Sequence, residues 1–153
     1  AYAHAISFRP LYDCQKPVDK NLMILSPSDM GFHNAIRRAD KSISFLDFEY
    51  FGLDDPVKLL SDTLWHPGMN LSDQEKIYLS DQFIDLFPDD AEFKNRLKAL
   101  WPLYGLRWSL IVLNAFRNKK NMENSDLLRV QYSKALSILN KLEKTGMICP
   151  YVH

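Results

Sequence analysis

Two groups of polar residues in the first third of the chain carry side chains that can move a proton and bind a metal ion. Asp29 lies five residues before Asn34, on a loop that follows the apolar segment 22–25. Asp47 comes about one hairpin later, and Glu49 follows it on the same face. A carboxylate can accept the proton of an attacking hydroxyl, so we predict that Asp29 is a general base. Amide and carboxylate oxygens suit Mg²⁺ together with substrate phosphates, and the predicted ligands are Asn34, Asp47 and Glu49.

The predicted metal site depends on the register of a β-hairpin. Residues 35–44 have the pattern of two short strands with a tip at residues 40–41. A loop of two or of four residues sets Asn34 opposite Asp47, where opposed Cβ atoms lie about 4.5–5.5 Å apart. A loop of three residues would shift the register by one and turn one side chain away. The prediction of a shared ion therefore requires an even-numbered loop.

These residues occur in an order known from protein kinases. In that template a catalytic-loop Asp is followed five residues later by a magnesium-binding Asn, and then by Asp-Phe-Gly; residues 47–49 read Asp-Phe-Glu here. Together with 26–34 and 54–56, the segment 45–52 resembles the C-terminal lobe of the aminoglycoside phosphotransferase and choline kinase superfamily. The resemblance extends over roughly residues 20–140, and its specific motifs lie within 26–62.

The resemblance implies a fold and an activity. The fold would be α+β and mainly α, the C-terminal lobe of a protein-kinase-like fold, with a small β-hairpin that carries the catalytic loop and the metal site. The activity would be transfer of the γ-phosphate of ATP (or GTP) to a hydroxyl of a small-molecule substrate, with Mg²⁺. Asp29, Asn34 and Asp47 match the family's base and metal ligands, and Ser28 and His33 would lie beside the nucleotide.

The chain departs from the family pattern at two positions. Pro27 stands where the family has a loop-bracing His, and Leu59 stands where a second Asp is usual, with Asp62 one turn later as a substitute. These departures leave a second interpretation open, a catalytically decayed kinase-like module that binds or interacts without turnover. A third, a metal-dependent phosphohydrolase, is disfavoured because further His and Asp ligands for a two-metal site are absent from the pattern.

The acceptor of the phosphate is not determined by the sequence. Asp54, Asp55 and Asp62 are candidate ligands for a cationic substrate, with helix capping as the alternative role. An aminoglycoside, choline, another amino alcohol and a sugar all remain open. Three aromatic residues are candidates either for a substrate pocket or for the core: Trp101, Tyr104 and Trp108.

Composition limits the classes of partner. The 153 residues contain 19 Lys and Arg and 19 Asp and Glu, so no charge excess indicates nucleic acid or an anionic membrane. Cys14 and Cys149 do not form a disulfide framework and are expected to be free thiols. The longest apolar stretch, 108–116, is too short to cross a bilayer, and no secretory signal opens the chain. We therefore expect a cytoplasmic protein.

Residues 1–153 are predicted to form one domain. The five glycines form no phosphate-cradling cluster, so the N-terminal nucleotide lobe of a kinase is absent from this chain. We expect the chain to be the C-terminal lobe of a longer enzyme and to be inactive alone. An apolar face is expected where that lobe would dock, which leaves a homo-oligomer open.

Periodicity and capping signals predict the helices. Helices are expected over residues 57–66 and 73–87, the second starting from the capping box Ser72–Glu75. A third is expected over 89–116, broken or kinked before Pro102, with 103–113 as the buried centre. The last is expected over 126–144 and is followed by Gly146.

Overall fold

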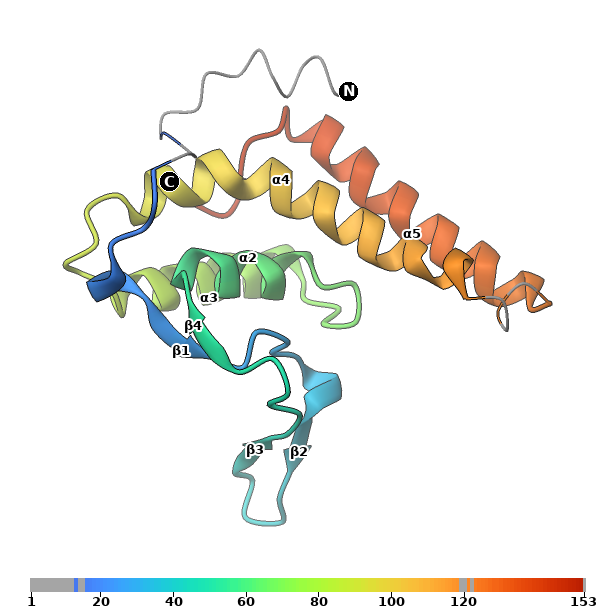
Figure 1. Cartoon of the computed structure of the whole chain (residues 1–153), viewed down its shortest axis with the longest axis horizontal. Helices are drawn as coiled ribbons and strands as arrows, with labels where there is room; N and C mark the ends of the chain where they lie inside the picture. The colour runs from blue at the N-terminus through green and yellow to red at the C-terminus, as the bar shows by residue number, and fades with distance from the viewer. Residues whose placement is uncertain (1–12, 14–15, 119–120, 122, 153) are drawn as a thin grey trace.

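The computed structural model describes residues 13, 16–118, 121 and 123–152. The fold is α+β and mainly helical, with two small antiparallel sheets (Figure 1), which confirms the predicted class. The elements in chain order are η1 (Lys20–Leu22), β1 (Ile24–Ser26), η2 (Phe32–Asn34), β2 (Ala35–Arg37), β3 (Ile43–Phe45), β4 (Gly52–Asp54), α2 (Pro56–Trp65), α3 (Asp73–Asp85), α4 (Phe93–Leu113), η3 (Asn114–Arg117) and α5 (Ser125–Lys144).

Strands β1 and β4 form a two-stranded antiparallel sheet next to α2. Leu25 pairs with Leu53, and Ser26 pairs with Gly52. Strand β1 overlaps the apolar segment 22–25, whereas β4 was not predicted. Strand β4 forms because the chain returns from the hairpin alongside β1, whose backbone groups need partners.

The hairpin of β2 and β3 has a register one residue away from the predicted one. Ile36 pairs with Ser44 instead of Phe45, and the Arg38 amide donates to the Ser42 carbonyl at 2.9 Å. The loop therefore has three residues. Its last residue, Lys41, has a φ of +70°, as in a three-residue loop that ends in the left-handed region.

The shift moves Asn34 away from the predicted partner. The Leu46 amide donates to the Asn34 carbonyl at 2.8 Å, so Leu46 and not Asp47 faces Asn34 in the ladder. Asp47 has a φ of +61° and lies beyond the end of β3. The strand alternation that placed Asn34 and Asp47 on one face therefore does not reach Asp47, and this part of the prediction was wrong.

Helix α2 is the central element of the core. Pro56 occupies its first turn, and the Asp55 side chain accepts from the Val57 amide at 2.9 Å, as proline and aspartate favour at a helix start. Every residue of α2 except Lys58 is buried. The helix lies between the sheet of β1 and β4 and helix α4 (Figure 1).

The predicted capping box starts α3. The Ser72 Oγ accepts from the Glu75 amide at 3.3 Å, and the Glu75 Oε2 accepts from the Ser72 amide at 2.8 Å. The predicted span 73–87 is confirmed to within two residues at its end. Two orphan amides of the first turn are satisfied in this way.

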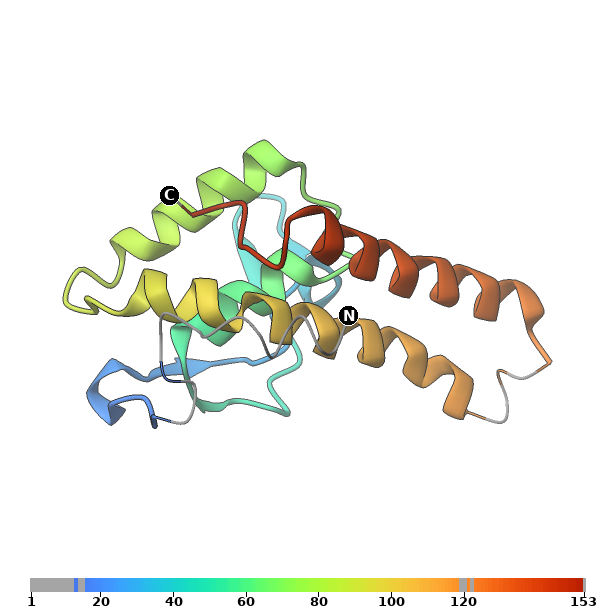
Figure 2. The same ribbon diagram turned by 90° about the horizontal axis from the view of Figure 1, so that it is seen from above.

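Helices α4 and α5 run side by side (Figure 1, Figure 2). Helix α4 continues through Pro102, so the predicted break is absent, and it starts later than predicted, at Phe93. Its second half is not buried all round, because Leu103 and Leu110 are 49% and 65% exposed. Helix α5 matches its prediction to within one residue and is followed by Gly146, whose φ is +60°.

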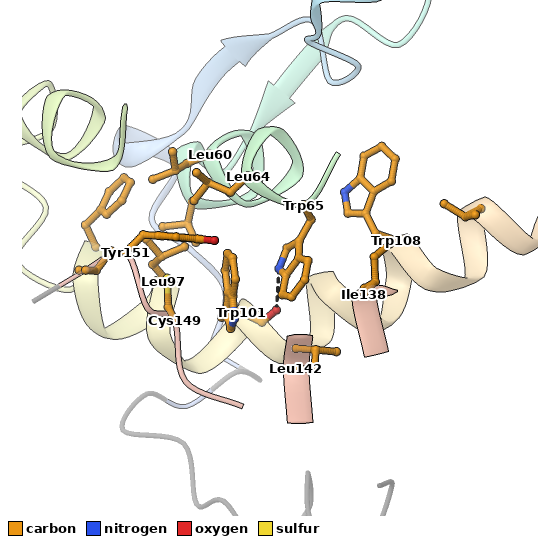
Figure 3. Close-up of a cluster of buried hydrophobic side chains, with 14 of the residues drawn as sticks. Leu60, Leu64, Trp65, Leu97, Trp101, Trp108, Ile138, Leu142, Cys149 and Tyr151 are labelled. Carbon is orange, nitrogen blue, oxygen red and sulfur yellow. Dashed lines mark hydrogen bonds between the residues drawn. The ribbon is translucent and has the colours of Figure 1, made fainter. Parts of the chain in front are cut away.

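Tryptophan side chains fill the space between α2 and α4 (Figure 3). The rings of Trp65 and Trp101 lie 4.2 Å apart, and the Trp65 indole N–H donates to the Trp101 carbonyl at 3.2 Å. Tyr151 packs edge-on against Trp101 at 5.6 Å. Trp101 is fully buried, so of its two candidate roles the structure shows core packing.

A buried ion pair joins the start of α2 to α4. The Arg96 guanidinium, 1% exposed, donates to Asp55 at 2.9 and 3.0 Å and to Asp90 at 2.6 and 3.1 Å. These bonds and charges raise the pKa of Arg96 against the opposing effect of its burial. Removing one partner of such a pair leaves a buried charge uncompensated, which destabilises by about 3–5 kcal/mol.

The helices and Cys149 can be compared with the predictions about membranes and thiols. In the part of the chain that the structure describes, none of the helices has the length and apolar content needed to cross a membrane. Cys149 is a free thiol, and burial raises its pKa to about 11. The prediction for Cys14 lies outside the described residues.

Candidate functional site

The loop between β1 and β2 is tightly folded by its own hydrogen bonds. The Ser26 side chain is buried and accepts from the Ser28 amide at 3.0 Å. Ser28 has a φ of +63°, and the Asp29 amide donates to the Pro27 carbonyl at 2.7 Å. These contacts turn the chain sharply, so that Asp29 projects from a bend held on the end of a strand.

The structure brings Asp29 and Asn34 together. The Asn34 side-chain amide donates to the Asp29 carbonyl at 3.0 Å and to its Oδ2 at 3.5 Å. The Asp29 side chain is 44% exposed. A carboxylate that is held on one side and open to solvent on the other is accessible to a hydroxyl that donates a proton.

Acidic residues after the hairpin gather around Tyr50. The pKa of the Tyr50 hydroxyl is raised, first by the charge and the hydrogen bond of Glu49 and, more weakly, by the charges of Asp47 and Asp29. The three carboxylates therefore act on one exposed phenol from two loops. Among the described residues, no Lys or Arg forms an ion pair with Asp47 or Glu49.

The donor set suits a hard divalent cation. Because the Asn34 amide nitrogen donates to Asp29, its amide oxygen is the atom left for a metal. Asp47 and Glu49 add carboxylates, and no Lys or Arg of the described residues pairs with them. Magnesium accepts such oxygens and keeps several waters, but among the described residues the structure does not gather Asp47 or Glu49 into a group of three acidic, His or Cys side chains around one ion position.

Two of the three acids predicted to bind substrate, Asp54 and Asp55, are paired with other side chains of the protein. The Asp54 carboxylate accepts from the Lys58 ammonium at 2.6 Å and from the Ser28 hydroxyl at 3.2 Å. Asp55 caps α2 and pairs with Arg96. These contacts are structural, and neither residue lines the cavity beside Asp29.

The third of these acids, Asp62, lines the cavity beside Asp29. Its Oδ1 accepts from the Arg107 guanidinium at 2.5 Å and from the Trp108 indole N–H at 2.9 Å. Its Oδ2 lies 3.2 Å from the Lys58 ammonium. Asp62 is 6% exposed, and a carboxylate this deeply buried needs such partners.

The cavity lies between the Asp29 loop, the end of α2 and the second half of α4. Its volume is about 480 Å³, in the range of small-molecule sites. It combines charged, aromatic and apolar walls. The lining residues are Ser28, Asp29, Tyr50, Asp62, His66, Arg107, Trp108 and Ile111.

Two histidines stand beside Asp29. The His33 Nε2 lies 3.6 Å from the Asp29 Oδ2, and the His33 and His66 rings stack at 4.7 Å and 17°. The His66 ring also packs edge-on against Trp108 at 4.6 Å. Burial lowers the pKa of His66, and the charge of His33 lowers it further.

Ligand atoms of Asp29, His33 and His66 lie within 4.8 Å of one another, close enough for one metal ion. The His66 Nδ1, however, accepts from the Gly68 amide at 2.9 Å. The neutral ring then carries its proton on Nε2, which makes that atom a donor and not a ligand. The contacts of His33 and His66 therefore fit a packed wall beside Asp29 better than a metal centre.

Sequence analysis missed His66 and Arg107 as site residues. No metal-ligand spacing singled out His66, because it reaches Asp29 only through the folding of α2 against the loop. Arg107 carried a signal that could have been used, since it interrupts the apolar run 103–113. A charge at such a position needs a buried partner, and that partner is Asp62.

Comparisons of the chain with protein-family models, with curated proteins and with solved structures found no match. The site is therefore defined by the structure of this chain. It comprises an acid–amide pair on a bend, further acids beyond a hairpin and an adjoining cavity.

Proposed function

We propose that the chain is the catalytic lobe of an ATP- and magnesium-dependent kinase that phosphorylates a small-molecule hydroxyl, as its resemblance to the aminoglycoside phosphotransferase and choline kinase superfamily implies. The observation that carries the proposal is the contact between Asp29 and the Asn34 amide. It joins the base to a metal ligand on one bend, next to a cavity of a suitable size. Protein kinases use the same pair of residue types.

In this proposal Asp29 accepts the proton of the acceptor hydroxyl. The hydroxyl oxygen bonds to the γ-phosphorus while the bond from phosphorus to the leaving oxygen of ADP breaks. The Asn34 amide oxygen and the carboxylates of Asp47 and Glu49 would hold Mg²⁺, which neutralises charge on the phosphates when bound. Ser28 and His33, which flank Asp29, would lie beside the nucleotide phosphates.

Bracing of the catalytic bend does not depend on a histidine at position 27. The family's His is replaced by Pro27, but the Ser26 hydroxyl and the Asn34 amide both bond to the bend. The stacked rings of His33 and His66 close it on the side of α4. These contacts support a working base despite the departure from the pattern.

The acceptor pocket would be the cavity of about 480 Å³. Its charges are mixed, because Asp29 and Asp62 are balanced by Arg107, which lines the cavity and is about half exposed. A polycation would meet the Arg107 guanidinium, whereas a neutral polyol could bond to all of these groups. We therefore propose a neutral or singly charged hydroxyl compound as the acceptor.

The proposal also requires a nucleotide-binding lobe with a glycine-rich loop, which the 153 residues do not contain. Large apolar side chains are exposed on both small sheets, on η2 and on the segment between β3 and β4, and in this proposal that lobe covers them. The residues are Leu25, Phe32, Ile36, Ile43, Phe45, Leu46, Phe48, Phe51 and Leu53.

The test is a phosphorylation screen of hydroxyl compounds with the full-length protein, ATP and Mg²⁺. Once a substrate is found, Asp29→Asn should lower kcat by at least a hundredfold without changing the fold, because a base contributes about 10²–10⁴. Asp47→Asn should lower kcat as well, because it removes a carboxylate proposed to hold Mg²⁺. Asp81→Asn, on the exposed face of α3, is the matched control and should retain activity. Substantial turnover by Asp29→Asn would refute the assignment of the base.

A binding module without turnover is the second candidate, which the loss of the family His at Pro27 favours. Isothermal titration of the full-length protein with ATP separates the two functions. Binding that requires Mg²⁺, together with turnover of any hydroxyl compound, supports the kinase. Nucleotide binding independent of Mg²⁺, without turnover, supports the module.

A further inference from the structure

A second cavity lies on the other side of the His66 segment and does not contain Asp29. Its volume is about 280 Å³, and it is formed by the end of α2, residues 66–71, the first half of α3 and one face of α5. His66 lines both cavities. The lining of the second cavity has a different chemical character from that of the first cavity.

The charge in this cavity is positive. Lys76 enters from α3, and Lys134 and Lys141 enter from α5. Ser137 lies between the two lysines of α5, and the spacing of three and four residues puts all three on one face of the helix. No acidic residue occurs among the described residues that line the cavity.

One carboxylate offsets part of this charge from outside the cavity. The Lys141 ammonium lies 3.5 Å from the Asp73 Oδ1 and also contacts the Tyr151 hydroxyl. Asp73 is itself 77% exposed and accepts from Tyr151 at 2.8 Å. Among the described residues, no carboxylate forms an ion pair with Lys76 or Lys134.

The Lys76 ammonium lies 5.6 Å from the centre of the Tyr151 ring, an aromatic contact that offsets part of the cost of its burial. The Lys76 side chain is half-buried, and burial lowers its pKa to about 8, with the neighbouring Lys141 as the second cause. The weaker influence of Asp73 acts in the opposite direction. An anion between the two ammonium groups would remove both causes, because it replaces lost solvation and separates like charges.

The neutral and apolar side chains that line this cavity indicate which kinds of ligand it can bind. The Asn70 amide and the Ser137 hydroxyl line the same cavity as hydrogen-bond donors. Trp65, Leu71 and Ile138 supply an apolar wall. Several donors around one small volume suit a compact dianion with many acceptor oxygens, and the apolar wall suits a small organic group attached to it.

We propose that this cavity is a binding site for a phosphate dianion, held by Lys76, Lys134 and Lys141. A free phosphate and a small phosphate monoester share this chemistry. The site is separate from the proposed kinase site, and its test needs neither ATP nor activity. Its failure and the failure of the proposed function are therefore distinguishable.

The test is calorimetric titration of the 153-residue chain at low ionic strength with phenyl phosphate, inorganic phosphate and benzoate. We expect phenyl phosphate to bind at millimolar or lower concentration and at least tenfold more tightly than benzoate, which carries a single charge. Tighter binding of phenyl phosphate than of inorganic phosphate assigns the site to a monoester, and equal binding assigns it to free phosphate. Absence of binding by both phosphates, or equal binding of benzoate, would overturn the proposal.

Single substitutions locate the site. Lys76→Gln and Lys134→Gln should each weaken binding about tenfold or more, since each removes a charge-assisted hydrogen bond. Lys76→Gln removes a charge whose burial is unfavourable, so this variant should fold normally. Lys20→Gln changes the same charge at the exposed η1 and should leave affinity within about twofold. Unchanged affinity in Lys76→Gln would place the ligand elsewhere and refute the proposal.

Proton uptake gives an independent readout. At pH 8 Lys76 is about half protonated, whereas a phosphate monoester is already a dianion. A bound dianion raises the pKa of Lys76, so the complex must take up protons from the buffer. Titrations in two buffers of different ionisation enthalpy should reveal this uptake, and Lys76→Gln should abolish it. An unchanged buffer dependence in Lys76→Gln would contradict the assigned role of Lys76.

Discussion

Asp29 is held by its neighbours and remains open to solvent. The Asn34 amide contacts both its backbone carbonyl and its carboxylate, and His33 lies 3.6 Å from the same carboxylate. The second histidine, His66, is half-buried, stacks on His33 and packs edge-on against Trp108. Protonation of His66 would therefore place a charge against two rings and partly out of water, and this cost outweighs the favourable charges of Asp29 and Asp62 nearby.

The pH dependence of stability should show the effect of His66. Burial and the charge of His33 lower its pKa from 6.5, so the unfolded chain binds a proton at this residue more readily than the folded one. Stability contributed by neutral His66 is then present above about pH 6.5 and is lost as pH falls toward the folded pKa. In His66→Gln, the loss of unfolding free energy between pH 7 and 5.5 should be smaller than in the wild type.

Urea denaturation at several pH values measures this difference. NMR titration of the histidine rings gives a direct check, because the His66 resonance should titrate below an ordinary histidine. A His66 resonance that titrates at or above pH 6.5 would contradict this account, as would equal acid sensitivity of the two proteins.

The residues of the candidate site differ in how far the sequence could predict them. The interval between Asp29 and Asn34 is short and lies on one loop, so local sequence was enough to bring them together. Asp62 was proposed without its partners, because Arg107 and Trp108 come from a helix more than forty residues later. Such pairs depend on how α2 packs against α4, which periodicity does not specify.

Among the elements, the helices were predicted well and the strands less well. Capping signals at Asp55 and Ser72 act within a few residues, and both are present in the structure. Strand β4 and the hairpin register depend on pairing with other segments, so local pattern does not decide them. The three-residue loop is favoured by Asp40, whose carboxylate accepts from the Ser42 amide and hydroxyl at 3.0 and 2.7 Å.

The conformation of Lys41 offers a test of the loop. Its φ of +70° is one that a residue with a Cβ adopts at a penalty of about 1 kcal/mol. Lys41→Gly should therefore leave the protein as stable or raise its free energy of unfolding by up to about 1 kcal/mol. Arg38→Gly, in the same hairpin but outside the left-handed region, should lower it.

Denaturant titration of the two variants compares them under one condition. If Lys41 had a negative φ instead, glycine would relieve no strain there, and both variants would lose stability. A loss of stability in Lys41→Gly equal to that in Arg38→Gly would thus contradict the left-handed conformation of Lys41. The register matters for function because it decides where Asp47 lies relative to Asn34.

The protein as a whole is organised around the contact of α2 with α4 and α5. This contact buries the tryptophan cluster on one side (Figure 3) and aligns Asp62 with Arg107 on the other. The two candidate cavities meet at the end of α2, where His66 lines both. Positions of the functional side chains therefore depend on how closely these helices approach.

Gly105 of α4 packs tightly against Trp65 of α2 and Leu142 of α5. A Cβ at this position would lie 2.8 Å from the Trp65 ring and 3.0 Å from both Leu142 methyl groups. Trp65 and Leu142 are buried, at 4% and 1% exposure, so neither has room to move away. Gly105→Ala gains up to about 1 kcal/mol in helix propensity, but overpacking of a tight core costs about 1–3 kcal/mol. Since the contact with Trp65 would be as short as 2.8 Å, the cost should fall in the upper half of that range, and we expect a net loss of about 1–2 kcal/mol.

Gly52→Ala is the matched control, because nothing lies within 4 Å of a Cβ there. Thermal or urea unfolding of both variants should show a loss for Gly105→Ala and little change for Gly52→Ala. Since Trp65 moves with any shift of α4, its fluorescence in the native state should change in Gly105→Ala alone. Equal stability of Gly105→Ala and the wild type would mean that α4 does not press on Trp65. The spacing of α2 and α4 that aligns Asp62 with Arg107 would then be wrong.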